Sequence, residues 1–298
     1  MEDWMAAAFL FWPLLAALVT LLVLIGFLLA IFIGGTIITG SFAVYWIYIF
    51  LRDEGFIKWA LNIIDRFRIK FADHLTKNIE KSFLVTGTLN EKGPILYTCH
   101  PHGLYGFSWY IHFSACLTKW PGQRPKLAVH SSLFRIPFVR ELMYLNNCIQ
   151  ATEKEILETL EKGESVALVL GGIEELHKTS GERIQLVLKK RNGFLRIAEK
   201  AGVPLVPLVT VGENELFPFL ESEWLKGTQD FLYSWFHIAI PVPTWKSFKE
   251  WISIVDRPLQ KSLKTYILKP LLKPTKKDYI QCILDFSKSE GVDIHIVA

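Results

Sequence analysis

The residue types best suited to chemistry in this chain of 298 residues are two histidines, His100 and His102. They belong to the tetrad His100-Pro101-His102-Gly103, which directly follows the apolar run 95–99. Histidine is the usual general base near neutral pH, and transfer of an acyl group to a hydroxyl needs such a base. Proline ends the hydrogen bonding of a strand, and glycine allows a backbone or a substrate to approach closely. We therefore predict His102 as the base, His100 as a catalytic or structural partner, and Pro101 and Gly103 as substrate contacts.

The tetrad has two other interpretations. Histidines are often satisfied residues of a protein core, and either ring could be one. The His-x-His spacing could also place two metal ligands on one side of a strand. Pro101 interrupts that strand, however, and the sequence offers no evident third ligand, so we predict no metal.

Two further loops follow apolar runs and contain glutamates. The run 165–170 leads into Gly171-Gly172-Ile173-Glu174-Glu175, and the run 205–211 leads into Gly212-Glu213-Asn214-Glu215. The carboxyl ends of parallel strands meet at one edge of a sheet, so both loops are expected near the tetrad. We predict that Glu175, or its neighbour Glu174, orients an imidazole or binds a polar group. Gly171, Gly172, Glu213 and Asn214 are predicted to contact substrate, although the first loop could be a simple turn with solvated glutamates.

A basic cluster, Lys189-Lys190-Arg191-Asn192-Gly193, stands directly before an expected helix. Cations beside a helix N-terminus suit a phosphate group, and coenzyme A carries several phosphates. We therefore predict that Lys189, Lys190, Arg191 and Gly193 bind acyl-CoA. The alternative is a solvated basic face.

Apolar runs alternate with stretches of helical periodicity through most of the chain. The expected strands are 95–99, 126–130, 165–170, 205–211 and 252–255. The expected helices are 104–117, 133–145, 152–163, 191–201 and 275–289. This alternation predicts an α/β fold, in which a mainly parallel central sheet is flanked by helices.

The first 51 residues have the composition of a membrane segment, because no Asp, Glu, Lys, Arg or His occurs from Trp4 to Leu51. One helix of that length would run about 72 Å, against a hydrocarbon core of about 30 Å. We therefore predict a transmembrane or re-entrant hairpin over 1–51, and the basic residues that follow favour a cytosolic domain. A single tilted anchor is an alternative. A cleaved signal peptide fits less well, because the chain starts with acidic residues and the apolar run is too long.

Two other segments have patterns typical of a membrane surface. Residues 52–82 combine apolar positions at helical spacing with basic ones, which predicts an amphipathic membrane-proximal helix or, alternatively, a helix packed on the domain. Residues 215–251 are rich in aromatic side chains and interrupted by prolines, which favours membrane contact over an irregular aromatic core. We expect 83–298 to form one α/β domain that includes this aromatic segment.

Composition excludes some classes of function. The formal net charge of +4 is too small to indicate nucleic-acid binding, and no nucleic-acid motif accompanies it. The four cysteines have neither metal nor disulfide spacing, so reduced thiols are expected.

Taken together, the motifs resemble the type 2 diacylglycerol acyltransferase family, which includes monoacylglycerol and wax-alcohol acyltransferases. The similar blocks occur in the same order, at Tyr97–Gly103, His130–Asn147, Gly171–Glu175, Arg191–Phe194 and Leu205–Glu215. One departure is Asn192, which stands where the family usually has lysine.

The resemblance implies an acyl-CoA-dependent O-acyltransferase of the endoplasmic reticulum membrane or lipid droplet, with no resident cofactor and acyl-CoA as co-substrate. Its partners would be the bilayer, acyl-CoA and a neutral lipid acceptor, with diacylglycerol first among acceptors. Monoacylglycerol, a long-chain alcohol, or a lysophospholipid or glycerol 3-phosphate remain alternatives, as does a catalytically inactive membrane scaffold. The sequence leaves open whether the chain forms a homo-oligomer.

Overall fold

A computed structural model describes residues 25–26, 40, 43, 73–89, 93–103, 106–114, 118–136, 139–172, 175, 184–188, 191–218, 220, 227, 242–254 and 256–297. The chain divides into two compact units, residues 1–73 with 130–148 and residues 74–129 with 149–298. The predicted hairpin at 1–51 lies almost entirely outside the described residues, as do most of 52–82 and most of 215–251. Within the described part of the chain, no helix is both long and apolar enough to cross a membrane.

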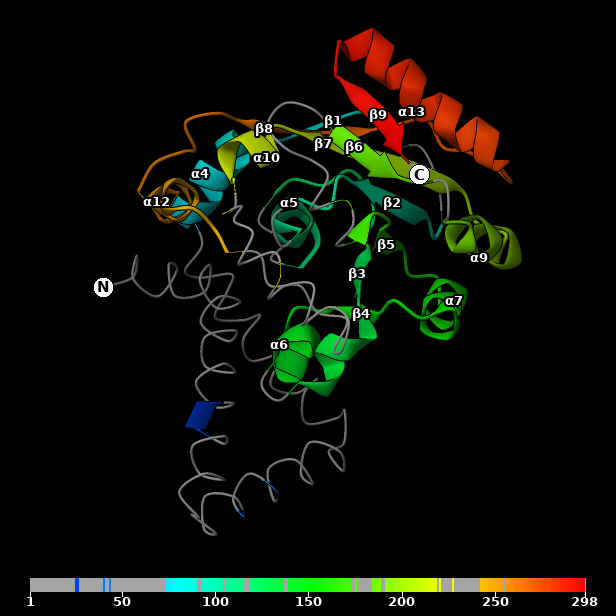
Figure 1. Cartoon of the computed structure of the whole chain (residues 1–298). Coiled ribbons are helices and arrows are strands. Elements are labelled where there is room, and N and C mark those ends of the chain that lie inside the picture. The colour runs from blue at the N-terminus through cyan, green and yellow to red at the C-terminus, as the bar shows by residue number, and fades with distance from the viewer. Residues whose placement is uncertain are drawn as a thin grey trace. The chain divides into compact units, whose positions relative to one another are not determined.

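A seven-stranded sheet forms the centre of the larger unit (Figure 1). Its strands are β1 (Phe83–Thr86), β2 (Leu96–His100), β3 (Lys126–Val129), β4 (Ile149–Gln150), β5 (Val166–Val169), β7 (Leu205–Val211) and β8 (Leu263–Ile267). The order across the sheet is β1-β8-β7-β2-β5-β3-β4. The five strands from β7 to β4 are mutually parallel, whereas β8 runs antiparallel to β7 and parallel to β1. The mainly parallel sheet predicted from the sequence is confirmed.

The three central strands, β7, β2 and β5, position the site. Every residue of β2 is buried, and so is all of β7 except its last residue, as expected for strands covered on both faces. The register pairs Cys99 with Val169 of β5 and His100 with Val209 of β7. Because the three strands are parallel and in this register, the loops that follow them leave from one edge of the sheet.

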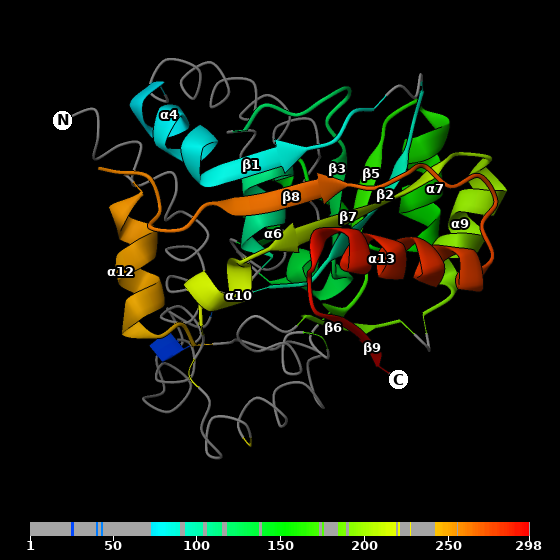
Figure 2. The same ribbon diagram turned by 90° about the horizontal axis from the view of Figure 1, so that it is seen from above.

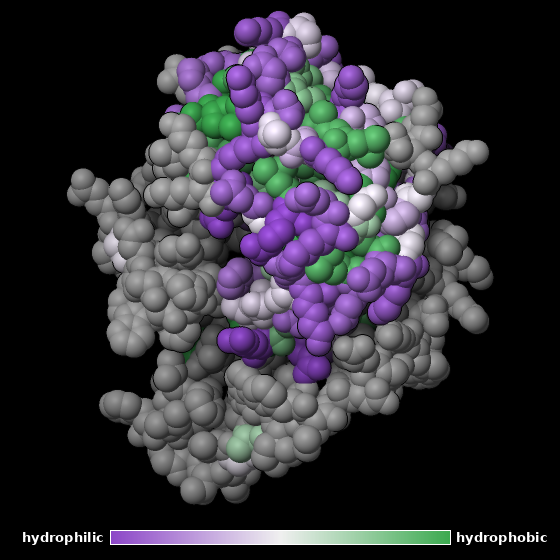
Figure 3. All heavy atoms as spheres, turned by 90° about the vertical axis from the view of Figure 1, so that its right-hand side faces the viewer, coloured by the Kyte–Doolittle hydropathy of each residue, from purple (hydrophilic) through white to green (hydrophobic). Residues whose placement is uncertain are grey.

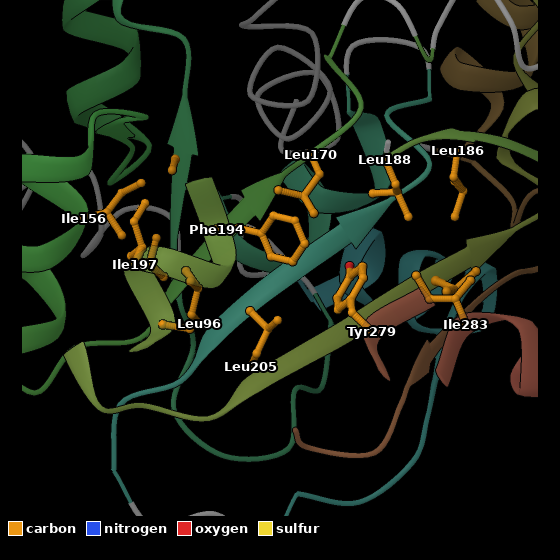
Figure 4. Close-up of a cluster of buried hydrophobic side chains, with 14 of the residues drawn as sticks. Leu96, Ile156, Leu170, Leu186, Leu188, Phe194, Ile197, Leu205, Tyr279 and Ile283 are labelled. Carbon is orange, nitrogen blue, oxygen red and sulfur yellow. The ribbon is translucent and has the colours of Figure 1, made fainter. Parts of the chain in front are cut away.

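Helices cover both faces of this sheet. The hydrophobic core on one face joins the sheet to α7 (Glu153–Glu161), α9 (Gly193–Ala201), α13 (Lys276–Glu290) and the separate strand pair β6 (Ile184–Val187) and β9 (Ile294–Val297). Figure 4 shows Phe194 and Tyr279 at the centre of this core, with Leu205 and Leu170 around them. The outer side of these helices carries mainly hydrophilic side chains with smaller hydrophobic areas between them (Figure 3).

The opposite face is aromatic. It is covered by α5 (Phe107–Trp109) and the π-helix η1 (Tyr110–Ser114) that continues it. Tyr97 of β2 contacts Phe113 and Trp120 there, with ring centroids 6.3 and 5.8 Å away. Alternate residues of a strand face opposite sides, so Tyr97 points to this aromatic layer while Thr98 and His100 point to the core under α13.

Two helices begin at the threonines that the sequence predicts as N-caps. Thr152 caps α7 by accepting the backbone N–H of Glu155, and Thr275 forms a full capping box with Asp278 at the start of α13. The predicted strand at 252–255 is wrong, because Ile252 and Ser253 form the end of α12 (Trp245–Ser253). Thr244 caps that helix, and a short apolar run by itself does not distinguish helix from strand.

Further elements belong to each of the two units. In the larger unit, α4 (Asp73–Ser82) precedes β1, and α10 (Glu213–Leu216) follows β7 (Figure 2). In the smaller unit, the 3-10 helix η2 (Ser131–Arg135) and α6 (Val139–Leu145) occupy the region expected to be helical at 133–145.

Candidate active site

The tetrad turns the chain sharply at the end of β2. His100 is the last residue of the strand, and the bond between His100 and Pro101 is cis. The carbonyl oxygen of Pro101 accepts a 2.9 Å hydrogen bond from the indole N–H of Trp109, a fully buried residue of α5. This contact ties the turn to the aromatic face, and it leaves His102 half-buried in the loop beyond the strand.

The ring of His102 is oriented by its own loop. Its Nδ1 lies 2.9 Å from the carbonyl oxygen of Gly103. A carbonyl only accepts hydrogen bonds, so Nδ1 carries the proton and donates it. In the neutral ring the lone pair is therefore on Nε2, the state that a general base requires.

Glu175 anchors the backbone of His102. Its carboxylate is fully buried; Oε2 accepts the backbone N–H of His102 at 2.8 Å, and Oε1 accepts that of Val187 at 3.2 Å. Gly171 makes room for this carboxylate, since a Cβ at residue 171 would lie 2.0 Å from the carboxyl carbon. Glu175 thus restrains the backbone of His102. Its hydrogen bond with His102 is to the backbone N–H and not to the imidazole ring.

His100 is fully buried behind His102. Its Nε2 is 2.7 Å from the hydroxyl of Tyr279 on α13, and its Nδ1 is 3.7 Å from Oε1 of Glu175. The phenol of Tyr279 in turn donates to Thr98 at 2.8 Å. This burial places His100 as a support for Glu175.

A second glutamate contacts the tetrad from the end of β7. Glu213 is 1% exposed and accepts the backbone N–H groups of Phe107 and Ser108, each at 3.2 Å. A Cβ at Gly103, whose φ is +61°, would lie 2.2 Å from Oε1 of Glu213. Burial raises the pKa of Glu213 to about 7, against the hydrogen bonds from Ser108 and Phe107 that lower it. Glu213 therefore lies directly against the tetrad loop as a buried group.

The cationic residue that the structure places at this edge is Arg191. It is exposed just before α9, and its Nη2 lies 4.0 Å from where a Cβ of Gly172 would be. Gly193, also exposed, is the first residue of α9, and Asn192 accepts a 2.7 Å hydrogen bond from Lys276. Arg191 thus lies beside the Gly171-Gly172 loop, and its role in binding phosphate stays a prediction.

Four other residues belong to the predicted site. Lys189, Lys190 and Glu174 lie outside the described residues. Asn214 is half-buried on α10, next to Glu213.

His112 shows what a purely structural histidine looks like in this fold. It is fully buried, and its Nδ1 and Nε2 are 2.9 and 2.8 Å from the hydroxyls of Thr118 and Thr265. Burial, with a smaller contribution from Arg124, lowers its pKa to about 3. Both ring nitrogens are engaged, whereas the interaction of His102 leaves Nε2 available.

Other types of chemistry find less support at this edge. Within the described parts of the chain, no group of three His, Cys, Asp or Glu side chains could hold a metal ion. Cys99 is buried in β2, and burial raises the pKa of its thiol well above the ordinary value, which disfavours the reactive thiolate.

Sequence reasoning missed the residues that support the tetrad from a distance. Tyr279, Thr98 and Trp109 each contact a tetrad residue or its partner. Neither Tyr279 nor Trp109 stands in a recognisable motif, and Thr98, although it lies in the block Tyr97–Gly103, was not predicted as a site residue. The available signal was the alternation of β2, which places Thr98 and His100 on one face. It could not identify Tyr279, which is 179 residues from His100.

Fold and site together define an α/β protein with two histidines at the carboxyl edge of a mainly parallel sheet. A family model described as "Diacylglycerol acyltransferase" matches residues 31–282 of this chain. The chain therefore belongs to the diacylglycerol acyltransferase family.

Curated relatives with three different acceptors in their names are similar to this chain. The diacylglycerol O-acyltransferase 2A of Umbelopsis ramanniana is 34% identical over 134 residues, 43% of this chain and 38% of the relative. The human acyl-CoA wax alcohol acyltransferase 2 is 31% identical over 153 residues, 48% of this chain and 46% of the relative. The 2-acylglycerol O-acyltransferase 1 of Bos taurus is 30% identical over 202 residues, 64% and 57% of the two chains. The chain thus spans about half the length of these relatives.

Proposed function

We propose that this chain is an acyl-CoA-dependent O-acyltransferase that esterifies the hydroxyl of a neutral lipid. The observation that carries the proposal is the hydrogen bond from Nδ1 of His102 to the carbonyl oxygen of Gly103. Because Nδ1 is engaged in this bond, Nε2 of the neutral ring can act as the base. Membership of the family and the names of the relatives support acyl transfer as the reaction.

The proposed reaction is a direct transfer. Nε2 of His102 takes the proton of the lipid hydroxyl as the hydroxyl oxygen attacks the thioester carbonyl carbon. The C–O bond forms, the C–S bond breaks, and the proton on Nε2 passes to the departing thiolate of coenzyme A. The products are an ester and free coenzyme A, and His102 returns to its starting state.

Arg191 is proposed to bind the phosphates of acyl-CoA. Its side chain is exposed and lies beside Gly172, at the edge of the sheet where the loop of His102 also lies. Acyl-CoA bound by Arg191 could therefore place its thioester near His102. The amide groups at the start of α9 add favourable dipoles for an anion. Lys189 and Lys190 are proposed to bind the same phosphates, because they directly precede Arg191 in the sequence.

The proposed acceptor is diacylglycerol, which would give triacylglycerol. We place the reaction at a membrane because of the uncharged stretch from Trp4 to Leu51, and on its cytosolic side because of the basic residues that follow. The endoplasmic reticulum or a lipid droplet is proposed from the family to which the chain belongs. Monoacylglycerol and long-chain alcohols are the competing acceptors, and they occur in the names of two of the relatives.

The decisive experiment combines the purified full-length chain with labelled acyl-CoA and separate acceptors in lipid vesicles. The acceptors are diacylglycerol, monoacylglycerol, a fatty alcohol, a lysophospholipid and glycerol 3-phosphate. His102→Ala is expected to lower kcat about 10³-fold, because general base catalysis typically contributes 10²–10⁴-fold. His295→Ala, which alters an exposed histidine paired with Asp293, is the matched control and should retain wild-type activity. An unchanged ester yield from folded His102→Ala protein would refute the assignment of the base.

The acyl-CoA site has its own test. Arg191→Glu is expected to raise the KM for acyl-CoA about tenfold or more, through loss of a charge-assisted contact, while the KM for the acceptor changes little. Arg196→Glu is the control, because Arg196 lies on α9 but pairs with Glu153. Equal effects of the two variants, or equal effects on both substrates, would contradict a coenzyme A site at Arg191.

A further inference from the structure

The hydroxyl of Tyr279 lies in a position that links the C-terminal helix to the tetrad. Tyr279 is fully buried on α13, with its ring 4.8 Å from that of Phe194 (Figure 4). Its oxygen is within hydrogen-bond distance of both Thr98 and His100, which lie on one face of β2. The phenol oxygen of Tyr279 therefore joins two other buried polar groups, the hydroxyl of Thr98 and the ring of His100.

The proton of this hydroxyl determines the tautomer of His100. Burial raises the pKa of Tyr279 well above its ordinary value, so the phenol keeps its proton, and it donates that proton to Thr98. The hydrogen bond between Tyr279 and His100 must then run the other way, from Nε2–H of His100 to the phenol oxygen. The remaining nitrogen, Nδ1, is the one that faces Glu175.

This tautomer sets the contact between His100 and Glu175. With hydrogen on Nε2, Nδ1 of His100 faces Oε1 of Glu175, 3.7 Å away inside the core. The tautomer that Tyr279 imposes therefore decides which nitrogen serves Glu175.

We propose that Tyr279 is a positioning residue, which holds the catalytic base in place through His100 and Glu175. The sequence of contacts is Tyr279 hydroxyl, His100 ring, Glu175 carboxylate and His102 backbone N–H. The inference rests on the proposed function, since it assigns to His102 the role of base. It also gives α13 a direct part in the geometry of the active site.

The first test is Tyr279→Phe, which keeps the ring and removes only the oxygen. We expect kcat to fall tenfold or more with the KM for acyl-CoA within twofold of wild type. Tyr266→Phe is the matched control, since Tyr266 also packs against α13, 4.9 Å from the ring of Phe286, and should retain wild-type kcat. A kcat within twofold of wild type in Tyr279→Phe, or the same loss in both variants, would overturn the proposal.

Thr98→Val separates positioning from general stability. In this variant the phenol keeps its contact with His100 but loses the acceptor that fixed the direction of that hydrogen bond, so the loss of kcat is expected to be smaller than in Tyr279→Phe. The double variant should be no worse than Tyr279→Phe alone, because both changes act on one chain of contacts. Fully additive losses would mean independent packing effects and would overturn the proposal.

A chemical readout distinguishes failure of this inference from failure of the proposed function. Diethyl pyrocarbonate modifies accessible histidine rings, and peptide mass spectrometry gives the rate at His102 whether or not the protein transfers acyl groups. We expect His102 to react at least threefold faster in Tyr279→Phe than in wild type and Tyr266→Phe, because its loop is less restrained. Equal rates in all three proteins would overturn the positioning role, whereas a rate change in a chain that acylates no acceptor would refute only the acyltransferase activity.

Discussion

Two buried glutamates approach the tetrad from the strands on either side of β2. Glu175 follows β5 and Glu213 follows β7; each accepts two backbone N–H groups, and each lies against a glycine. The likeness comes from the parallel sheet, which brings the loops after neighbouring strands to one edge.

The two carboxylates differ in their partners. Glu175 has the ring of His100 3.7 Å away and binds the backbone N–H of His102 itself. The hydrogen bonds to Glu213 come from the amides of Phe107 and Ser108, at the start of α5, and burial raises its pKa to about 7. The comparison teaches that similar burial can restrain different parts of the chain: Glu175 restrains the backbone of His102, while Glu213 restrains the start of the helix that follows the tetrad.

The same substitution at both positions gives the largest expected difference. Glu175→Gln should lower kcat about 100-fold, or about 3 kcal/mol in activation free energy, because an amide cannot accept from both His102 and Val187. Glu213→Gln loses the same acceptor capacity but should change kcat less than about threefold, since Glu213 contacts neither histidine ring. Kinetics on folded protein at saturating acyl-CoA measure both values. Equal losses would show that the two glutamates act alike and would remove the distinction drawn above.

Gly171 lies against Glu175, and Gly103 lies against Glu213. Alanine at either position should destabilise the fold, but a second substitution should restore stability at only one of them. Gly171→Ala is expected to destabilise the fold by about 3 kcal/mol or more, because its Cβ would lie 2.0 Å from the carboxyl carbon and 2.4 Å from the Cβ of Glu175. Gly103→Ala should cost a similar amount, through a 2.2 Å contact with the Glu213 carboxylate and a φ of +61°.

Glutamate truncation separates the two cases. Glu213→Ala removes the three atoms nearest to a Cβ at residue 103, so Gly103→Ala in that background should cost mainly the backbone strain of about 1–2 kcal/mol. Glu175→Ala leaves the Cβ of Glu175 in place, so Gly171→Ala should remain severe. Thermal unfolding measures these effects when each Gly→Ala variant is compared with wild type, and each double variant with the corresponding Glu→Ala variant. Full relief at Gly171 would contradict the contact described here.

The sequence was sufficient to predict the edge on which the site is built. Long apolar runs that end in His100, Gly171 or Gly212 predict buried parallel strands, and parallel strands bring their ends together. The cap of α13 was equally predictable, since Thr275 and Asp278 have the spacing of a capping box.

The partners of the buried groups could not be predicted in the same way. A sequence shows that Glu175 is near the tetrad but not that its hydrogen bond goes to the backbone of His102 rather than to its ring. The contact between Tyr279 and His100 joins residues 179 positions apart, and Tyr279 otherwise looks like one more apolar position of a helix. The antiparallel placement of β8 was missed because its short sequence, Leu263–Ile267, has mixed polar and apolar residues.

The pH dependence of stability also distinguishes the two glutamates. Glu213 has an ordinary pKa of 4.5 that burial raises to about 7 in the folded protein, so folding favours its protonated form. Its contribution to stability is complete below pH 4.5 and is lost as the pH rises to 7, by up to about 3 kcal/mol. Glu213→Gln does not titrate, so the stability of wild type relative to this variant should fall between these pH values and then stay level.

Unfolding of the detergent-solubilised chain from pH 4.5 to 8 measures this difference. Glu161→Gln, which changes an exposed glutamate at the end of α7, is the control and should parallel wild type throughout. A wild type whose stability relative to Glu213→Gln is constant over this range would mean that Glu213 carries its charge in the folded state. In that case the two glutamates would differ less than their surroundings suggest, and the distinction between them would rest on the contacts of Glu175 with His100 and with the backbone of His102.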